Sequence, residues 1–533
     1  MKKQHIKFKS VLSDNARKKI IIWSNKKRSI IELIDLIIDF QIDCSIDKDI
    51  IDGYSRDWSN IPGNAEAITR PKTEYECAII MFACNRSKIP ITITAGQTNL
   101  NGSATPIGGI VLSIEKMKTP IIKVDISAKS VLSPVGIYLE DMRKECLNQS
   151  NQSLYYPVDP TSRNEAMVGG TLSCNASGFV PGPSGATRYW VKSLNFLTLT
   201  GYKITCSRGQ YISSKGQFIL DYGSHKEILE VPTYPRPNIK NASGPYSSEN
   251  GILDFVDLVI GSEGIFGLIS SVTFNLKIMP SNFLNLFFTL PNEENAIKFH
   301  KYLIDYFKYD LSQITALEYF GYNCRSYMEG WEKLFKIEDE VGIYLQIPLY
   351  DDTIDIAAEK WFRIIQSSNC QVNQEAIILL NDPRNWQIFF NARHSIPVNA
   401  LKKTHQLDTW SILTDTIVPP ENFKFFLIKT HKILRESKIE YLLFGHLGDC
   451  HLHFHMIPTK VQQKMALTIY DEIIKQSNKL GGVYSADHGT GKRKRSDFLE
   501  CYGIKGVKNI HKTKMIFDPE YLLNRGNVIE YTM

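Results

Sequence analysis

The stretch Thr-Ala-Gly-Gln-Thr-Asn-Leu-Asn-Gly, residues 94–102, directly follows the apolar run 89–94, which we expect to be a buried strand. Two more glycine-rich segments follow: Gly-Gly-Thr-Leu-Ser-Cys-Asn-Ala-Ser-Gly at 169–178 and Gly-Ser-Glu-Gly-Ile-Phe-Gly at 261–267. Glycine lets the backbone adopt positive φ and present N–H groups to an anion. Each segment alone is compatible with an ordinary turn, but three in one predicted domain favour a site for a nucleotide pyrophosphate.

None of these segments is a standard dinucleotide or P-loop motif. The pattern GxGxxG at the start of a helix after the first strand is absent. Gly491-Lys492 resembles the end of a P-loop, but Ala486 occupies the position of the first P-loop glycine. The sequence therefore argues against a Rossmann NAD-binding domain and against an ATPase.

The order of predicted elements around the glycine segments indicates an α+β domain. Apolar periodicity predicts helices at 28–41 and 74–88 and strands at 89–94, 110–114, 255–260 and 268–278. The turn-rich stretch 155–188 is too long for a linker and is typical of a ligand-binding loop. The polar stretch 241–250 is expected to be an exposed, mobile excursion.

After about residue 280 the pattern predicts a second α+β domain. We expect strands at 283–290, 342–348 and 441–445, and helices at 293–309, 354–368, 421–437 and 461–480. The strand 441–445 leads into a histidine-rich segment, and a glycine turn precedes a loop at 485–495.

The composition fits a multidomain globular protein. The 533 residues are too many for one core, and 43% hydrophobic and 22% charged residues are ordinary values. The net charge of +6 comes largely from an N-terminal arm that we expect to be a solvated tail and helix, with attachment to an anionic membrane surface as the alternative. The arm carries Lys2, Lys3, Lys7, Lys9, Arg17, Lys18, Lys19, Lys26, Lys27 and Arg28.

The ten cysteines are scattered and form no CxxC pair. This spacing argues against an iron–sulfur cluster or a cysteine-rich zinc site and favours reduced thiols in the cytoplasm. Neither a secretory signal nor a membrane span is evident in the sequence. Any redox chemistry is therefore expected to come from a bound cofactor.

The order of motifs resembles that of the FAD-linked oxidases of the vanillyl-alcohol oxidase type over roughly residues 55–530. Besides the three glycine segments, the resemblance rests on Arg70-Pro71, Tyr156-Pro157-Val158-Asp159-Pro160, Phe444-Gly445-His446-Leu447-Gly448-Asp449, Asp487-His488-Gly489-Thr490-Gly491-Lys492, Phe517-Asp518-Pro519 and Asn524-Arg525-Gly526-Asn527-Val528. The branch it resembles contains D-lactate dehydrogenases, glycolate oxidase subunits, D-2-hydroxyglutarate dehydrogenases and alkylglycerone-phosphate synthases.

This resemblance implies a two-subdomain PCMH-type FAD-binding domain at 56–280 and an α+β substrate-binding cap domain at 281–490. Residues 1–55 form the N-terminal arm and helix, and residues 491–533 return to the FAD domain. No histidine lies near 94–109, so we expect FAD to be non-covalent. The residues that match the family's cofactor contacts are Ala95, Gly96, Gln97, Thr98, Asn99, Leu100, Pro157, Asp159, Gly169, Gly170, Ser173, Asn175, Gly178, Glu263, Gly264, Ile269 and Asn524.

The chemistry is expected in the segment Gly-His-Leu-Gly-Asp-Cys-His-Leu-His-Phe-His, 445–455. His451, His453 and His455 alternate, so on a strand they share one face, as ligands of a divalent metal would. An incidental stripe on a half-exposed strand is the alternative. The resemblance implies that His446, His453 and Asp487 hold a metal such as zinc; the family usually has Glu at 487.

The resemblance also implies that His488 is the general base and that Arg393 grips a substrate carboxylate. A neutral imidazole can accept a hydroxyl proton near neutral pH, and a guanidinium binds a carboxylate through two hydrogen bonds. For His488 the alternative is a residue that caps a helix or only supports the side chains of the site, and for Arg393 it is a surface arginine. The basic run Lys492–Arg495 is expected to be a solvated face.

The expected function is oxidation of a small D-2-hydroxy acid, similar to D-lactate, to the 2-oxo acid, with hydride transfer to flavin N5. Electrons would pass to a quinone, a cytochrome or another flavoprotein. A flavin transferase resembling alkylglycerone-phosphate synthase is the first alternative, and a flavin-free protein that binds nucleic acid through the basic run is the second. We expect a cytoplasmic protein with no nucleic-acid partner, and with peripheral membrane contact as the open variant.

Overall fold

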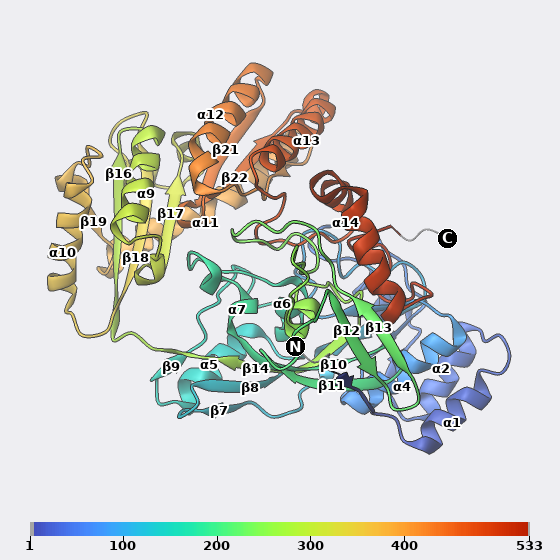
Figure 1. Cartoon of the computed structure of the whole chain (residues 1–533). Helices are drawn as coiled ribbons and strands as arrows, with labels where there is room; N and C mark the ends of the chain where they lie inside the picture. The colour runs from blue at the N-terminus through green and yellow to red at the C-terminus, as the bar shows by residue number, and fades with distance from the viewer. Residues whose placement is uncertain (1–4, 531–533) are drawn as a thin grey trace.

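The computed structural model describes residues 5–530, which form two α+β parts that meet near residue 280 (Figure 1). The N-terminal part is blue to green in Figure 1, and the second part, which we call the cap, runs from yellow to orange. The last long helix, α14 (Arg495–Phe517), leaves the cap and packs against the N-terminal part near β13 (Lys226–Glu230).

One sheet of the N-terminal part has four strands in the order β3-β4-β6-β5. Helix α4 (Glu74–Ser87) starts at Thr73, whose side chain accepts a hydrogen bond from the Glu76 N–H, and contributes eight consecutive buried residues to the core. The other elements of this region are α1 (Asp14–Trp23), α2 (Ile30–Asp39), α3 (Lys48–Asp52), β3 (Cys44–Ser45), β4 (Ala67–Thr69), β5 (Ile91–Thr94) and β6 (Ile110–Ser113).

The second sheet of this part has six strands in the order β2-β11-β10-β14-β8-β7, and a three-stranded sheet β1-β12-β13 lies beside it. Its elements are β1 (His5–Lys7), β2 (Lys9–Ser10), β7 (Lys123–Asp125), β8 (Ser130–Pro134), α5 (Leu139–Gln149), β9 (Leu154–Tyr155), α6 (Val168–Cys174), α7 (Thr187–Trp190), β10 (Val191–Leu197), β11 (Tyr202–Ser207), β12 (Gln217–Asp221), α8 (Phe255–Val259), β14 (Leu268–Asn275) and β15 (Lys277–Ile278).

The N-terminal arm is part of the fold rather than a solvated tail. Strand β1 pairs with β12, β2 pairs with β11, and Ile6 and Ile20 are fully buried. Lys2 and Lys3 lie outside the described residues. The expectation of a solvated tail is wrong for residues 5–10 because apolar side chains between the charges anchor the arm to the sheets.

The cap is a seven-stranded sheet in the order β19-β16-β18-β17-β21-β22-β20. Helices α9, α10, α12 and α13 share a core with one face, whereas α11 and the ends of several strands form a second core on the other. The elements are β16 (Asn282–Leu290), α9 (Glu293–Tyr306), β17 (Ala316–Phe320), β18 (Val341–Leu349), α10 (Ile354–Ser367), β19 (Ile378–Leu379), α11 (Pro383–Gln406), β20 (Ile412–Leu413), α12 (Pro420–Ser437), β21 (Glu440–His446), β22 (His451–Ile457) and α13 (Gln463–Lys479).

Three expectations about local structure are wrong. Residues 255–259 form helix α8 instead of a strand, because the Asp254 side chain caps it at the Val256 N–H. The predicted loop 155–188 contains helix α6, which begins one residue before the second glycine segment and includes its first half. The supposedly exposed stretch 241–250 is mostly buried: Ala242 and Ser243 bond to Ser485, so this stretch packs beneath the loop 485–495.

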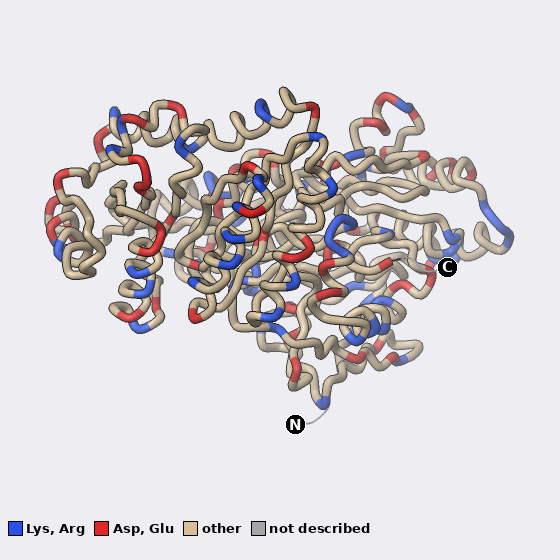
Figure 2. Tube along the Cα trace, turned by 90° about the horizontal axis from the view of Figure 1, so that it is seen from above, with Lys and Arg blue, Asp and Glu red and all other residues tan. Residues whose placement is uncertain are grey.

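Acidic and basic residues are mixed along the chain trace, and no large region of a single sign is seen in the view of Figure 2. Among residues 5–530, no helix combines the length and the apolar character needed to cross a membrane. All ten cysteines are free thiols, which agrees with the expectation from their spacing.

Candidate active site

A cavity of about 570 Å³ lies where the N-terminal part meets the cap. Its walls include all three glycine segments and, across from them, residues of β17, β21, β22, α11 and the 485–495 loop. The predicted cofactor residues on its wall are Ala95, Gly96, Gln97, Thr98, Asn99, Leu100, Asp159, Gly169, Gly170, Ser173, Gly178, Glu263, Gly264, Ile269 and Asn524. The cavity thus joins the predicted cofactor loops to the predicted catalytic residues.

The first glycine loop is shaped to receive an anion. Gly96 packs so closely on residue 165 that an added Cβ would lie 2.1 Å from the Glu165 carbonyl oxygen. Gln97 has a φ of 55°, which turns the chain sharply. In the described part of the chain, no protein acceptor receives the N–H groups of residues 96–100. These N–H groups belong to residues that line the cavity and have no protein partner, so this loop fits the pyrophosphate of FAD.

The side chain of Glu263 ties this loop to the tail of the protein. Its carboxylate accepts hydrogen bonds from Ser103 Oγ at 2.6 Å and from the N–H groups of Thr490 and Gly491, both at 2.7 Å. The left-handed φ of 52° at Glu263 directs the side chain inward. Its carboxylate is therefore committed to protein partners, and any contact with a cofactor falls to the neighbouring backbone.

Two of the other predicted cofactor residues, Asn524 and Asn175, bond to the protein backbone. The Asn524 side chain accepts a hydrogen bond from the Ile93 N–H and donates one to the Ile93 carbonyl, so it pairs with the edge of β5. Asn175 ends α6 in a left-handed conformation and accepts the Arg188 N–H. Neither Asn175 nor Pro157 is on the cavity wall, unlike the other predicted contacts.

Strand alternation explains why the histidines meet. His451, His453 and His455 lie on one face of β22, as predicted, whereas Leu452, Phe454 and Met456 enter the core on the opposite face. On β21, pairing with β22 places His446 opposite His451. His446, His453 and His455 line the cavity together with Glu318 from β17.

The imidazoles fit a divalent metal. His446 Nδ1 lies 2.6 Å from Glu318 Oε1, and His453 Nδ1 lies 3.0 Å from the Thr414 carbonyl oxygen, so each Nε2 is left as a free lone pair. One nitrogen each of His446, His451 and His453 lies within 4.8 Å of the others. The strand alternation placed His451 on the same face as His453, but the metal set implied by the family resemblance did not include it.

Asp487 stands beside these imidazoles but belongs to a second group with Asp415 and His451. Its Oδ2 lies 3.6 Å from His446 Nε2 and 3.4 Å from His451 Nδ1. These spacings exceed those of ordinary hydrogen bonds and match the ~3.4 Å that separates two ligands bound at ~2.1 Å to a tetrahedral zinc ion. Among the described residues, the predicted trio His446, His453 and Asp487 does not form one group within 4.8 Å; the two groups that do form share His451, which is therefore an additional candidate ligand of a zinc-type ion.

A lysine that the sequence did not single out lies next to this group. Lys240 Nζ lies 3.3 Å from both Asp449 Oδ2 and Asp487 Oδ1 and donates to the Gly178 carbonyl at 3.1 Å, with its side chain 1% exposed. Burial alone would raise the pKa of Asp487, but Lys240, the largest opposing influence, holds it well below its usual range. Lys240 thus connects the glycine segment, the cap and the 485–495 loop.

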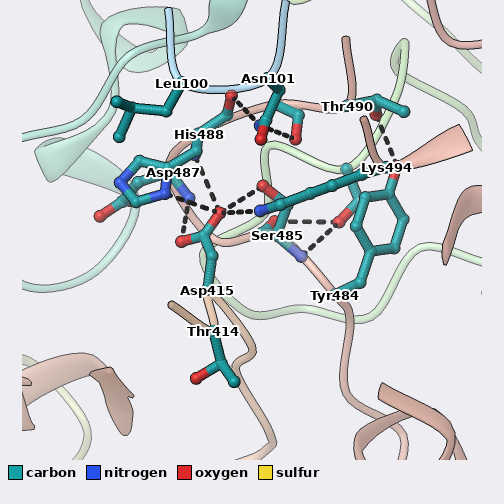
Figure 3. A network of polar contacts seen from close by, with 12 residues as sticks. Leu100, Asn101, Thr414, Asp415, Tyr484, Ser485, Asp487, His488, Thr490 and Lys494 are labelled. Carbon is teal, nitrogen blue, oxygen red and sulfur yellow. Dashed lines mark hydrogen bonds and ion pairs between the residues drawn. The ribbon is translucent and has the colours of Figure 1, made fainter. Parts of the chain in front are cut away.

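The predicted base His488 is oriented by Asp415, which lies at the centre of the network in Figure 3. Asp415 Oδ2 lies 3.4 Å from His488 Nδ1 and accepts hydrogen bonds from the His488 N–H, Ser485 Oγ and Lys494 Nζ at 3.1, 2.5 and 3.0 Å. Burial lowers the pKa of His488 below its ordinary value, although Asp415 opposes this. The His488 ring stacks on His453 with centroids 5.8 Å apart.

The expectation of a solvated face is wrong for Lys492 and Lys494 in the basic run 492–495, whereas Arg493 is exposed. Lys494 is 4% exposed and pairs with Asp415, and Lys492 donates to the Gly102 carbonyl and to Asn527 Oδ1. Arg493 donates to the carbonyl oxygens of Leu100 and Ser59. The run holds the tail loop against the first glycine loop, so the feature on which the nucleic-acid alternative rested has a structural role.

Arg393, on α11, also reaches the cavity. Its guanidinium lies 4.6 Å above the Phe179 ring and 3.7 Å from Glu318 Oε2. Glu318 also bonds to His446, so it links the predicted substrate-binding arginine to a predicted metal ligand. It was not singled out from the sequence, because a lone glutamate in a strand carries no motif.

Comparison with known proteins agrees with this arrangement. Residues 65–207 match the FAD binding domain family, and residues 313–528 match the C-terminal domain of FAD linked oxidases. A D-lactate dehydrogenase of Anaerostipes hadrus is 25% identical over 499 residues, which cover 91% of this chain and 94% of that protein. A D-2-hydroxyglutarate dehydrogenase of Xanthomonas citri pv. viticola is 24% identical over 493 residues, 90% of this chain and 93% of its own length.

Solved structures show the same fold. Alkyldihydroxyacetonephosphate synthase aligns with a TM-score of 0.65 at 14% identity over 94% of this chain and 85% of its own. p-Cresol methylhydroxylase with substrate bound aligns with a TM-score of 0.66 at 14% identity over 97% and 98% of the two chains. The fold and the cavity define a flavin-dependent oxidoreductase of α+β, PCMH-type architecture. The chain belongs to the FAD-linked oxidase family.

Proposed function

We propose that this protein oxidises a D-2-hydroxy acid to the 2-oxo acid, with His488 as the general base. One observation carries the proposal. A single cavity has free backbone N–H groups suited to FAD on one wall, and an oriented imidazole and a guanidinium on the other. The named relatives are dehydrogenases of D-lactate and D-2-hydroxyglutarate, which supports the reaction class.

The protein side chains divide the work as follows. Because burial lowers its pKa, His488 is uncharged at neutral pH and can accept the hydroxyl proton of the substrate. Asp415 orients that imidazole and stabilises the cation that forms. Arg393 grips the substrate carboxylate, with Phe179 holding the guanidinium plane. FAD, bound without a covalent link, would supply the acceptor for the hydride that leaves C2.

A divalent metal would be held by His446 and His453 with Asp487 or His451. Such an ion would bind the substrate carboxylate or hydroxyl oxygen and lower the pKa of the hydroxyl group. The electrons collected from the substrate would pass to an external acceptor: a quinone, a cytochrome or another flavoprotein. A D-lactate dehydrogenase [cytochrome] of Kluyveromyces lactis, 23% identical over 518 residues, supports the second of these.

The test is anaerobic reduction of the purified flavoprotein by D-2-hydroxy acids, repeated with His488→Gln and Arg393→Lys. Loss of the base is expected to lower the rate of flavin reduction by ~10²–10⁴-fold. Arg393→Lys is expected to raise KM more than it lowers kcat, because a point charge replaces bidentate recognition. A flavin transferase with this fold would bind its substrates without net reduction of a dye, and such a result would replace the dehydrogenase proposal.

A further inference from the structure

One buried imidazole in the cavity has no use in the scheme above. His455, on β22, is 8% exposed, and among residues 5–530 neither of its ring nitrogens has a hydrogen-bond partner. A buried polar atom without a partner is destabilising, because it has lost the hydrogen bonds that water would make. Native structures keep few such groups, and one that faces a cavity is a candidate for binding a ligand atom.

The surroundings of His455 are apolar. The cavity wall near it on the cap side includes Leu413, paired with His455 across the β20–β22 ladder, and Phe444, whose ring centroid lies 6.4 Å from that of His455. His455 forms no ion pair with any described residue. An imidazole has two ring nitrogens that can hydrogen-bond, and here neither has a protein partner.

The position of His455 fixes which part of a substrate it would meet. His453, which stacks on the base His488, is two residues earlier on the same face of β22. Two residues along a strand span ~6.8 Å, and a hydrogen bond covers ~2.9 Å of that distance. The phenyl ring of Phe444 lies near both imidazoles, 5.8 Å from His453 and 6.4 Å from His455. A substrate with its reacting carbon beside His453 therefore needs a side chain of several bonds to reach His455.

We propose that His455 determines specificity for a D-2-hydroxy acid whose side chain carries an uncharged hydrogen-bonding group, such as a hydroxyl or an amide, three or four bonds from C2. The proposal rests on the proposed dehydrogenase function. A methyl side chain, as in lactate, leaves both nitrogens of His455 unpaired. A terminal carboxylate would bury a charge where no cation is paired with His455.

The test compares side chains that differ in one group. D-2,5-dihydroxypentanoate carries a hydroxyl where its near-isostere D-2-hydroxyhexanoate carries a methyl group; D-lactate and D-2-hydroxyglutarate complete the panel. Steady-state reduction of a dye by the enzyme gives kcat/KM for each acid, and perturbation of the flavin spectrum on titration gives Kd. Both are measured for the wild type, His455→Leu, His455→Gln and the exposed control His405→Leu.

We expect the dihydroxy acid to exceed its methyl isostere by roughly 10- to 100-fold in kcat/KM. His455→Leu is expected to abolish or invert this ratio, whereas His455→Gln keeps most of it and His405→Leu leaves it unchanged. If the ratio is near one in the wild type, or if His455→Leu lowers all acids equally, the specificity proposal is wrong while the dehydrogenase function stands. If no acid reduces the flavin, the proposed function fails, and the ratio of Kd values still decides whether His455 reads the side chain.

Discussion

Replacing Lys240 with methionine removes a charged group that joins three separate segments at the site. The side chains are similar in length, so the substitution leaves little empty space and isolates the loss of charge. In the native protein the ammonium lies 3.3 Å from both Asp449 and Asp487 and bonds to the Gly178 carbonyl. After substitution two buried carboxylates lose this partner.

The size of the effect follows from burial. The side chains of Lys240, Asp449 and Asp487 are 1%, 5% and 11% exposed, so water cannot replace the lost ammonium. Breaking a buried ion pair by removing one partner costs ~3–5 kcal/mol. We expect Lys240→Met to lower the free energy of unfolding by that amount, and Lys240→Met combined with Asp487→Asn to lose less than the two single changes added together.

Urea unfolding followed by circular dichroism measures this difference, with the exposed Lys508→Met as the matched control. The control is expected to stay within ~0.5 kcal/mol of the wild type. If Lys240→Met also stays within that margin, the ammonium does not compensate the two carboxylates and the reasoning is refuted.

Four further predictions test other parts of the site. Glu263→Ala leaves the N–H groups of Thr490 and Gly491 unpaired. At ~1–3 kcal/mol for each buried donor, it is expected to lower the free energy of unfolding in urea by ~2–6 kcal/mol. A loss below ~1 kcal/mol would show that the Glu263 carboxylate does not hold this loop. Burial lowers the pKa of His300 to about 4, whereas the pKa in the unfolded chain is ~6.5. The unfolded chain therefore binds the proton first, and the free energy of unfolding falls as the pH drops from about 6.5 through about 4. His300→Gln should make that fall less steep when unfolding is measured across this pH range. Protein loaded with zinc and then desalted should retain the metal in the wild type and lose most of it in His446→Ala, as measured by elemental analysis, because the variant is expected to bind zinc ~10- to 100-fold more weakly. Equal retention in the two proteins would argue against the metal site. Arg393→Lys should raise KM for the hydroxy acid at least ~10-fold in steady-state assays, and an unchanged KM would remove Arg393 from substrate binding.

The periodicity of apolar residues in the sequence was sufficient to predict the bounds of several long helices and strands. Helices α4, α10 and α12 and strands β16 and β18 lie within two residues of their predicted bounds, because long amphipathic or alternating runs commit to one structure. Helix α8 was missed because five apolar residues fit a strand as well as a helix, and the aspartate cap decided between them. No element was predicted for residues 495–517, which form α14.

The site was predictable where a motif repeats and hidden where a single residue acts alone. The alternation of His451, His453 and His455 specified one face of a strand before the fold was known. Lys240 and Asp415 carry no such pattern. Lys240 follows a proline-rich stretch that reads as an exposed loop, and only long-range packing beneath Ser485 brings it to the carboxylates.

The visible spectrum of the purified protein, recorded without oxygen before and after addition of D-2-hydroxy acids, tests the central claim most directly. The account predicts an FAD spectrum that bleaches with at least one of these acids and does not bleach with the same acid in His488→Gln on the same time scale. A protein that holds no flavin even after incubation with FAD, or a bound flavin that none of the acids reduces, would contradict it.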